Sequence, residues 1–388
     1  MPTKLSLRDG ALLFALLLVA GFFSVDWAAL LQSGSFQLTP FLSSRNFSLL
    51  MIDFAITATL AMGMLLVILP GHIDLSAGSG VGLVGGVAAV LVIGHDWPAP
   101  LAMLAAMIVA LCLWFAMGTL IVRQRIPAFI ITLGGLLAFK GLFWLVIQNR
   151  TVPVVSGGGT NLFSLLTTYY LPPLGGYLLA AVVIAALVAA RLRTRRERRV
   201  HALSNEDGEV TFLQLFIAAQ LIGLFVLVTN QFRGVPLPVL ILGAVAFAVY
   251  VLTRHTPFGR YLYAIGGNEE AAVISGIPVA KVTIAAFTLM GGVVAITGLM
   301  QTAYSGSSTT TVGDLMELDA IAACVIGGVS LKGGRGTVLG VLFGALIMAC
   351  LLNGMSLLAV EPEKKFIARG LVLILAVWMD VHLARKKG

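Results

Sequence analysis

Long apolar runs follow one another along almost the whole of this chain of 388 residues, and each is about as long as a membrane-spanning helix. Because lipid offers no hydrogen-bond partners, a backbone that crosses a membrane must form helices or a closed barrel. The runs are continuous, whereas the strands of a barrel alternate apolar and polar residues. The sequence therefore predicts an all-α polytopic membrane protein.

The amino-acid composition supports this fold class. Hydrophobic residues make up 59% of the chain and charged residues only 11%, whereas soluble domains carry about 25% charged residues. This excludes a cytosolic enzyme and a disordered chain. The three cysteines lie inside apolar runs without paired spacing, which argues against a disulfide scaffold and against a cysteine metal site.

We place about twelve transmembrane helices on the apolar runs. They are predicted at residues 11–31, 48–70, 77–94, 98–122, 127–148, 175–191, 211–229, 235–253, 282–304, 315–330, 336–354 and 366–383. The tenth is short, so a re-entrant or broken helix is the alternative there.

The distribution of Lys and Arg sets the orientation, because cytoplasmic loops carry an excess of both. With the N-terminus inside, eighteen of these residues fall on the cytoplasmic side and six on the outer side. We therefore expect both termini to be cytoplasmic.

One strongly polar stretch divides the chain into two transmembrane halves, residues 1–190 and 211–388. This stretch, residues 191–210, begins RLRTRRERR. A basic patch of this kind can bind nucleic acid, but between two spans it fits a charged cytoplasmic loop better. We expect no nucleic-acid partner.

The sequence gives little support for catalysis. Gly80, Gly82 and Gly85 match a dinucleotide-binding pattern, but they lie in an apolar helix that follows no strand. The sequence holds neither a P-loop nor a cluster of metal ligands, so we expect no enzyme activity, no metal and no cofactor in this chain. The glycines fit helix packing better, because small residues four apart let helices approach closely. They recur in this way at Gly78, Gly82 and Gly86 and at Gly336, Gly340 and Gly344.

Ionisable residues inside spans are costly, at about 2.5–3.5 kcal/mol each near a helix centre, and call for a function or a partner. A pair of Lys140 with Asp53 or Asp319 would offset part of that cost. We place Asp53, Asp74, Lys140 and Asp319 on a candidate translocation pathway for a hydroxyl-rich solute. A structural ion pair or a contact with lipid headgroups is the alternative.

Residues 254–281 predict a short cytoplasmic helix. Pro257 and Gly259 end the preceding span, Gly266 and Gly267 form a turn, and Asn268 is a good N-cap. The helix is then expected over residues 269–275, with two glutamates in its first turn and Gly276 and Pro278 after it. Its small residues Ala271, Ala272 and Ser275 would suit the groove of another protein, and an ordinary loop is the alternative.

Residues 259–277 resemble the coupling-loop signature of permeases from monosaccharide ABC importers of the ribose and xylose type. Three more segments agree with that family, at residues 73–79, 127–141 and 318–328. The resemblance covers residues 45–380, and residues 191–229, 233–236 and 376–380 look closest to the D-xylose branch.

The resemblance implies a permease homodimer in the bacterial inner membrane. It implies an ABC ATPase subunit that carries ATP and Mg²⁺, a periplasmic sugar-binding protein, and membrane lipid around the spans. The coupling helix that docks into the ATPase would comprise Gly266, Gly267, Asn268, Glu269, Glu270, Ala271, Ala272, Ser275 and Gly276. Lys140 stands where the family often has Arg, and His72 stands where it often has Gly or Glu.

The function implied is ATP-driven sugar uptake, with D-xylose as the pentose. A permease for another monosaccharide or for a nucleoside is one alternative. A different class is an ion-coupled secondary transporter, which would need no docking helix and would still work when ATP is depleted.

Overall fold

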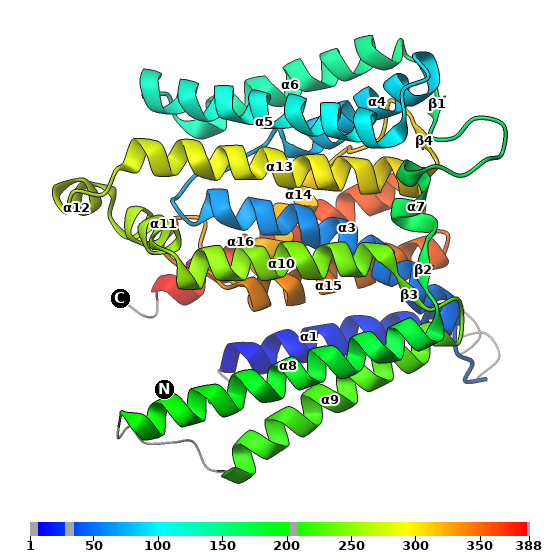
Figure 1. The fold of residues 1–388 in the computed structure, drawn as a ribbon, viewed down its shortest axis with the longest axis vertical. Coiled ribbons are helices and arrows are strands. Elements are labelled where there is room, and N and C mark those ends of the chain that lie inside the picture. Colours follow the sequence, from blue (N-terminus) through cyan, green and yellow to red (C-terminus); the bar gives the residue numbers. More distant parts are fainter. Residues whose placement is uncertain (1–6, 28–34, 202–207, 386–388) are drawn as a thin grey trace.

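The computed structural model describes residues 7–27, 35–201 and 208–385, and it is an assembly of helices that lie side by side (Figure 1). Each of the twelve predicted spans overlaps one helix, and residues 28–31 of the first span lie outside the described residues. These helices are α1 (Leu7–Ser24), α3 (Ser44–Ile68), α4 (Ala77–Gly94), α5 (Ala99–Gln124), α6 (Ala128–Ile147), α8 (Pro173–Val200), α9 (Gly208–Asn230), α10 (Leu237–His255), α13 (Val279–Ser305), α14 (Met316–Ile326), α15 (Val338–Leu357) and α16 (Pro362–Arg385). The predicted all-α polytopic fold is confirmed.

Nine helices in the described part of the chain are long and apolar enough to cross a membrane. The helices at three predicted spans, α1, α14 and α16, are not among them. Helix α14 is too short, because its 11 residues span only about 16 Å at 1.5 Å per residue. The segment predicted as a span at residues 315–330 is therefore a half-length helix, which is the broken alternative.

The two ends of the helix bundle carry different elements (Figure 1). One end holds the short helices α11 (Pro257–Gly267) and α12 (Glu269–Ile274), the start of α1 and the end of α16. The opposite end holds α7 (Leu162–Thr168) and two short antiparallel strand pairs. These are β1 (Val152–Pro153) with β4 (Ser307–Ser308), and β2 (Tyr170–Leu171) with β3 (Val235–Pro236). The short helix η1 (Pro40–Leu42) precedes α3.

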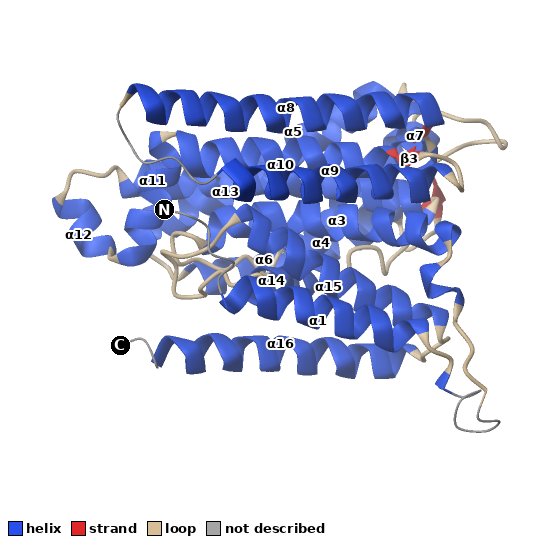
Figure 2. Cartoon of the chain, turned by 90° about the horizontal axis from the view of Figure 1, so that it is seen from below, coloured by secondary structure: helices blue, strands red, loops and turns tan. Residues whose placement is uncertain are grey.

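Helix α3 forms the centre of the core. It contacts α10, α13, α14 and α15, and nearly all its side chains from Ala55 to Ile68 are buried. Helix α6 packs mainly on α4 and lies at one edge of the bundle (Figure 1), and α16 packs mainly on α14 and lies at another edge (Figure 2). The glycines that recur every four residues allow close packing, as predicted, since a side chain on Gly82, Gly86 or Gly344 would collide with a neighbouring element.

The predicted cytoplasmic loop at residues 191–210 begins later than expected. Helix α8 continues through Val200, so the arginines of this stretch lie on a helical extension. Residues 202–207, in the middle of the predicted loop, lie outside the described residues. A helix can continue past its apolar part into this charged stretch, because its backbone hydrogen bonds are made within the helix and do not depend on surrounding lipid.

Two non-helical segments interrupt the helices of the core. Residues 69–76 join α3 to α4, and residues 309–315 lead into α14. They meet where the backbones of Gly78 and Gly313 touch, since a Cβ on Gly78 would lie 2.5 Å from the Gly313 carbonyl oxygen. Helices α4 and α14 therefore begin inside the bundle, next to each other.

Candidate translocation pocket and cytoplasmic coupling region

A polar cavity of about 370 Å³, which we call the outer polar pocket, opens near the end of the bundle that carries β4. It lies between α3, α13, α15, α16 and the start of α14. Its lining includes Asp53, Thr57, Gln301, Ser305, Thr309, Thr311, Asp314, Asp319, Asn353, Ser356 and Arg369. This density of hydroxyl, amide and carboxylate groups is unusual inside a membrane domain and suits a hydroxyl-rich ligand.

Asp53 is a half-buried carboxylate of this pocket. The side chains of Tyr304 and Asn353 form hydrogen bonds with it. The Asn353 Oδ1 atom accepts a further hydrogen bond of 2.9 Å from the Asn46 Nδ2 atom. Side chains from three helices thus meet at this carboxylate, and its place on a translocation pathway stays a prediction.

Asp319 lies on the first turn of α14 and is only 4% exposed. Its Oδ1 atom lies 3.3 Å from the Nε atom of Arg369 on α16. A buried carboxylate needs such a partner. The sequence prediction considered only Lys140 as a partner for Asp319, so the pairing with Arg369 was missed.

Lys140 does not pair with Asp53 or Asp319, and that prediction is wrong. Its Nζ atom binds the Asp314 carboxylate and donates a hydrogen bond of 2.9 Å to the Thr310 carbonyl oxygen. The cause lies in segment 309–315, which brings Asp314 next to α6. Lys140 consequently lines a smaller neighbouring cavity, with Ser79, Leu136, Glu317 and Phe366, and Asp314 belongs to both cavities.

Asp74 is fully buried and does not line the outer polar pocket. Its Oδ1 atom accepts hydrogen bonds from the Ser76 backbone N–H (2.8 Å) and hydroxyl (2.6 Å), and its Oδ2 atom accepts one of 2.6 Å from the Trp114 indole. These bonds tie the segment before α4 to the middle of α5. The geometry gives Asp74 a structural task.

Several uncharged residues of the outer polar pocket were missed because a single Thr, Gln or Asn inside an apolar run is an ordinary feature of a membrane helix. The missed pocket residues are Gln301, Thr309, Thr311, Asn353 and Ser356. Glu317, which lines the neighbouring cavity, was also passed over. Their common signal is position in the chain. They lie near the last residues of α13 and α15, in segment 309–315, or on the first turn of α14.

At the opposite end of the bundle, Asn268 caps α12 as predicted. Its side chain accepts a hydrogen bond of 2.9 Å from the Ala271 N–H, and Gly276 follows the helix with φ +79°. Glu269 and Glu270 lie exposed in the first turn. Figure 1 shows α12 at the outermost point of this end of the molecule.

Two details of the predicted coupling segment need correction. Gly266 and Gly267 do not form a turn but end helix α11, because Pro257 begins a new helix rather than only ending the previous one. Ala272 is only 3% exposed, so it packs inward instead of facing a partner. The exposed surface of α12 instead includes the apolar side chains of Val273 (57% exposed) and Ile274 (87% exposed), which the prediction missed.

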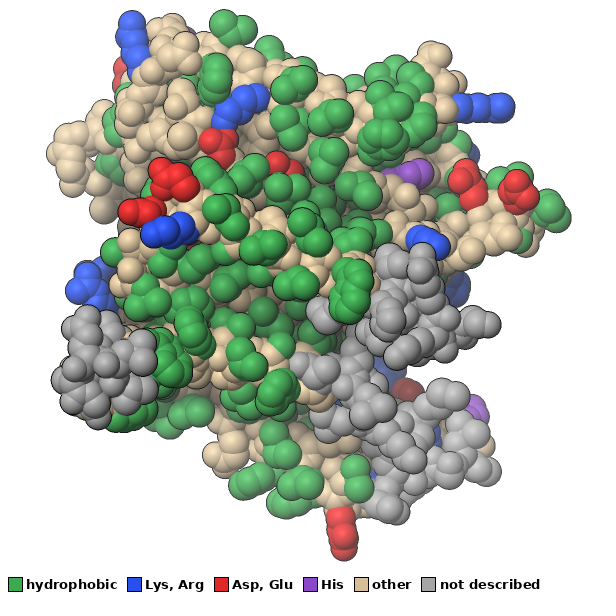
Figure 3. Space-filling view, turned by 180° about the vertical axis from the view of Figure 1, so that it is seen from behind, with side chains coloured by type: hydrophobic (Ala, Val, Ile, Leu, Met, Phe, Trp, Pro, Cys, Tyr) green, Lys and Arg blue, Asp and Glu red, His purple; other side chains and the backbone are tan. Residues whose placement is uncertain are grey.

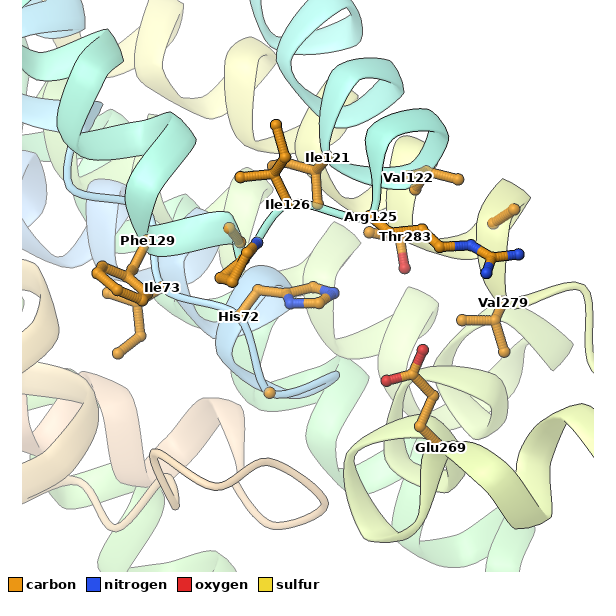
Figure 4. A pocket seen from close by; sticks show the side chains of 14 residues that line it. His72, Ile73, Ile121, Val122, Arg125, Ile126, Phe129, Glu269, Val279 and Thr283 are labelled. Carbon is orange, nitrogen blue, oxygen red and sulfur yellow. The ribbon is translucent and has the colours of Figure 1, made fainter.

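A second cavity, of about 650 Å³, lies between α12, α13, the α5–α6 junction and segment 69–76. Its walls are largely apolar, and the His72 ring points into it in the region of Arg125 and Glu269 (Figure 4). Burial lowers the pKa of His72, and the nearby Glu269 carboxylate opposes that shift.

Comparison with known proteins assigns this architecture to a transport family. Residues 46–377 match the family described as the permease component of the branched-chain amino acid transport system. The chain belongs to this permease family. It is accordingly a multi-pass membrane transport permease, as predicted.

The similar curated proteins are sugar permeases. The xylose transport system permease protein XylH of Haemophilus influenzae is 39% identical over 99% of this chain and 98% of its own length. The XylH protein of Escherichia coli K12 is 40% identical over 89% and 87%. The ribose import permease protein RbsC of Escherichia coli K12 is 33% identical over 88% and 87%. The resemblance to permeases of the ribose and xylose type is therefore confirmed. No solved structure matches the chain.

Proposed function

We propose that this chain is the membrane subunit of an ATP-driven importer of D-xylose in a bacterial inner membrane. The observation that carries the proposal is the 39% identity with a xylose permease along essentially the entire length of both chains. The outer polar pocket supports it, because carboxylate, amide and guanidinium groups are suited to hydrogen-bond the hydroxyls of a pentose.

The pocket also suits delivery from outside. It opens at the end opposite to α12, where a periplasmic sugar-binding protein would dock. The excess of Lys and Arg on segments at the α12 end supports a cytoplasmic location for that end and for both termini. The proposed pathway residues are Asp53 and Asp319, with Lys140 and Asp314 beside them.

The coupling region supports a cytoplasmic ATPase partner. Helix α12 presents exposed carboxylates at Glu269 and Glu270 and exposed apolar side chains at Val273 and Ile274. Such an apolar patch with a charged rim is typical of a protein interface. The ATPase would bind ATP and Mg²⁺ at its own site, so this chain would need no cofactor.

A second copy of the chain is the proposed partner within the membrane. The face seen from behind in Figure 3 is broadly hydrophobic, and α16 lies on this side of the bundle (Figure 2). Lys140, Asp314 and Glu317 line a cavity that also includes Phe366 of α16. Charged groups at such a position are costly against lipid, and a homodimer across α6 and α16 would cover them.

The test is xylose uptake into liposomes that hold the permease with its ATPase and binding protein. We expect uptake only when ATP is present on the side of the membrane that carries the ATPase, and we expect ribose to compete poorly with xylose. Asp53→Asn should reduce uptake by about tenfold, because a carboxylate that accepts substrate hydroxyls is lost. Leu221→Ala on the exposed face of α9 is the control for insertion. Uptake driven by an ion gradient without ATP would support a secondary transporter instead.

A further inference from the structure

Three backbone segments meet at the cytoplasmic end of the bundle. They are the end of α11 at Gly266, the turn after α3 at residues 69–71, and the turn between α14 and α15 at residues 330–335. The first segment leads directly into α12. Of the other two, the turn at residues 69–71 leads toward α4, and the turn at residues 330–335 follows α14.

The contact is made by backbone alone. The Gly334 N–H donates a hydrogen bond of 2.9 Å to the Leu69 carbonyl oxygen, which joins the two turns. Gly266 lies directly on this bond, and a Cβ at Gly266 would overlap with both of its atoms. A Cβ placed on Gly333 would lie 2.8 Å from the Gly266 Cα atom. Gly333 and Gly334 have φ values of +85° and +73°, which only glycine adopts readily.

Helix α11 is fixed to these turns strongly enough to move with them. Leu262 is fully buried and Ile265 is 3% exposed, both in the main core cluster. The Tyr263 hydroxyl donates a hydrogen bond of 2.8 Å to the Gly336 carbonyl oxygen, just before α15. Asn268 connects α11 to α12 without an intervening loop. A displacement of α12 is therefore carried into the junction.

From the junction, both turns lead to the polar cavities. The turn at residues 69–71 continues into the segment that Asp74 anchors and then into α4. The turn at residues 330–335 follows α14, which reaches Asp319 of the outer polar pocket within about 16 Å of helix. The two routes come together again at the contact of Gly78 with Gly313.

We propose that Gly266 is a positioning residue for transport, through which movement of α12 reaches α4 and α14 at once. The absence of a side chain lets α11 rest directly on the bond between the two turns. The chain segments that connect the two turns with α4 and α14 then shift together, and the outer polar pocket changes with the position of α12. This inference rests on the proposed function, because it assumes that an ATPase moves α12.

The test compares Gly266→Ala with Gly243→Ala, a helix glycine in α10 that has no atom within 4 Å of an added Cβ. Each variant is reconstituted with the ATPase and the binding protein, and xylose uptake and ATP hydrolysis are measured together. We expect Gly266→Ala to assemble and hydrolyse ATP while the sugar carried per ATP falls by about tenfold, since small misplacements have large effects on such steps. Gly243→Ala should keep the wild-type ratio.

Tyr263→Phe keeps the test decisive if Gly266→Ala fails to fold. It removes one hydrogen bond of the same junction, so the sugar carried per ATP should fall while the binding of the ATPase subunit is unchanged. A wild-type ratio in a folded Gly266→Ala complex, or in Tyr263→Phe if the alanine variant does not assemble, would overturn the inference. Failure of the proposed function would look different, since the unsubstituted complex itself would then not take up xylose with ATP.

Discussion

The hydrogen bond from Trp114 to Asp74 offers a direct test of how the segment before α4 is held. Trp114 and Asp74 are both fully buried, and the indole N–H lies 2.6 Å from the Asp74 Oδ2 atom. Trp114→Phe retains an aromatic ring but removes the donor. The Trp114 side chain also fills the space beside Gly80 and Gly291, where an added Cβ would collide with it.

The expected loss of stability follows from these contacts. A buried acceptor left without its donor costs about 1–3 kcal/mol, and the smaller ring leaves a void that adds on the order of 1 kcal/mol. At roughly 2 °C per kcal/mol for a chain larger than a small domain, the unfolding temperature should fall by at least about 4 °C. The measurement is thermal unfolding of the purified protein in detergent or nanodiscs.

Two controls separate the hydrogen bond from the general effect of losing an indole. Trp97→Phe changes a 45% exposed side chain at the other end of α4 and should leave the unfolding temperature nearly unchanged. Asp74→Ala combined with Trp114→Phe should cost less than the sum of the two single substitutions, because both remove the same bond. A Trp114→Phe protein as stable as the wild type, or strict additivity in the double variant, would refute the anchoring role of Asp74.

Two further predictions concern other contacts. Because burial lowers the pKa of His72 from its ordinary value of 6.5, the folded state disfavours the protonated ring, so stability should decline as the pH falls from about 7.5 to about 5.5. In His72→Gln, thermal unfolding at the two pH values should show a smaller difference than in the wild type, and an equal difference would contradict this role. Gly78→Ala should lower stability by about 1–3 kcal/mol because its Cβ overlaps with Glu317 and Gly313, whereas Gly223→Ala in α9, where space is open, should be neutral or slightly stabilising. Equal unfolding temperatures for these two variants would refute the close contact between the starts of α4 and α14.

The resemblance at residues 259–277 led to the correct transport family, but the same residues did not reveal how they pack. Asn268 as a cap is a local property, because a side chain and a backbone N–H three residues apart decide it. The burial of Ala272 and the exposure of Ile274 depend on the neighbours of α12 in space. Helix propensity alone carries no such information.

What the sequence by itself determined is the membrane fold. An apolar run long enough to cross the hydrocarbon layer must be helical, because every backbone amide there needs a hydrogen-bond partner. The positions of the twelve helical segments therefore follow from local composition. What only the tertiary structure decided is which polar groups meet. Lys140 binds Asp314 rather than Asp53 or Asp319, and Arg369 pairs with Asp319, because segment 309–315 and the short helix α14 carry the two carboxylates to these partners. Pairings between residues far apart in the chain depend on the packing of the backbone, which no local pattern specifies.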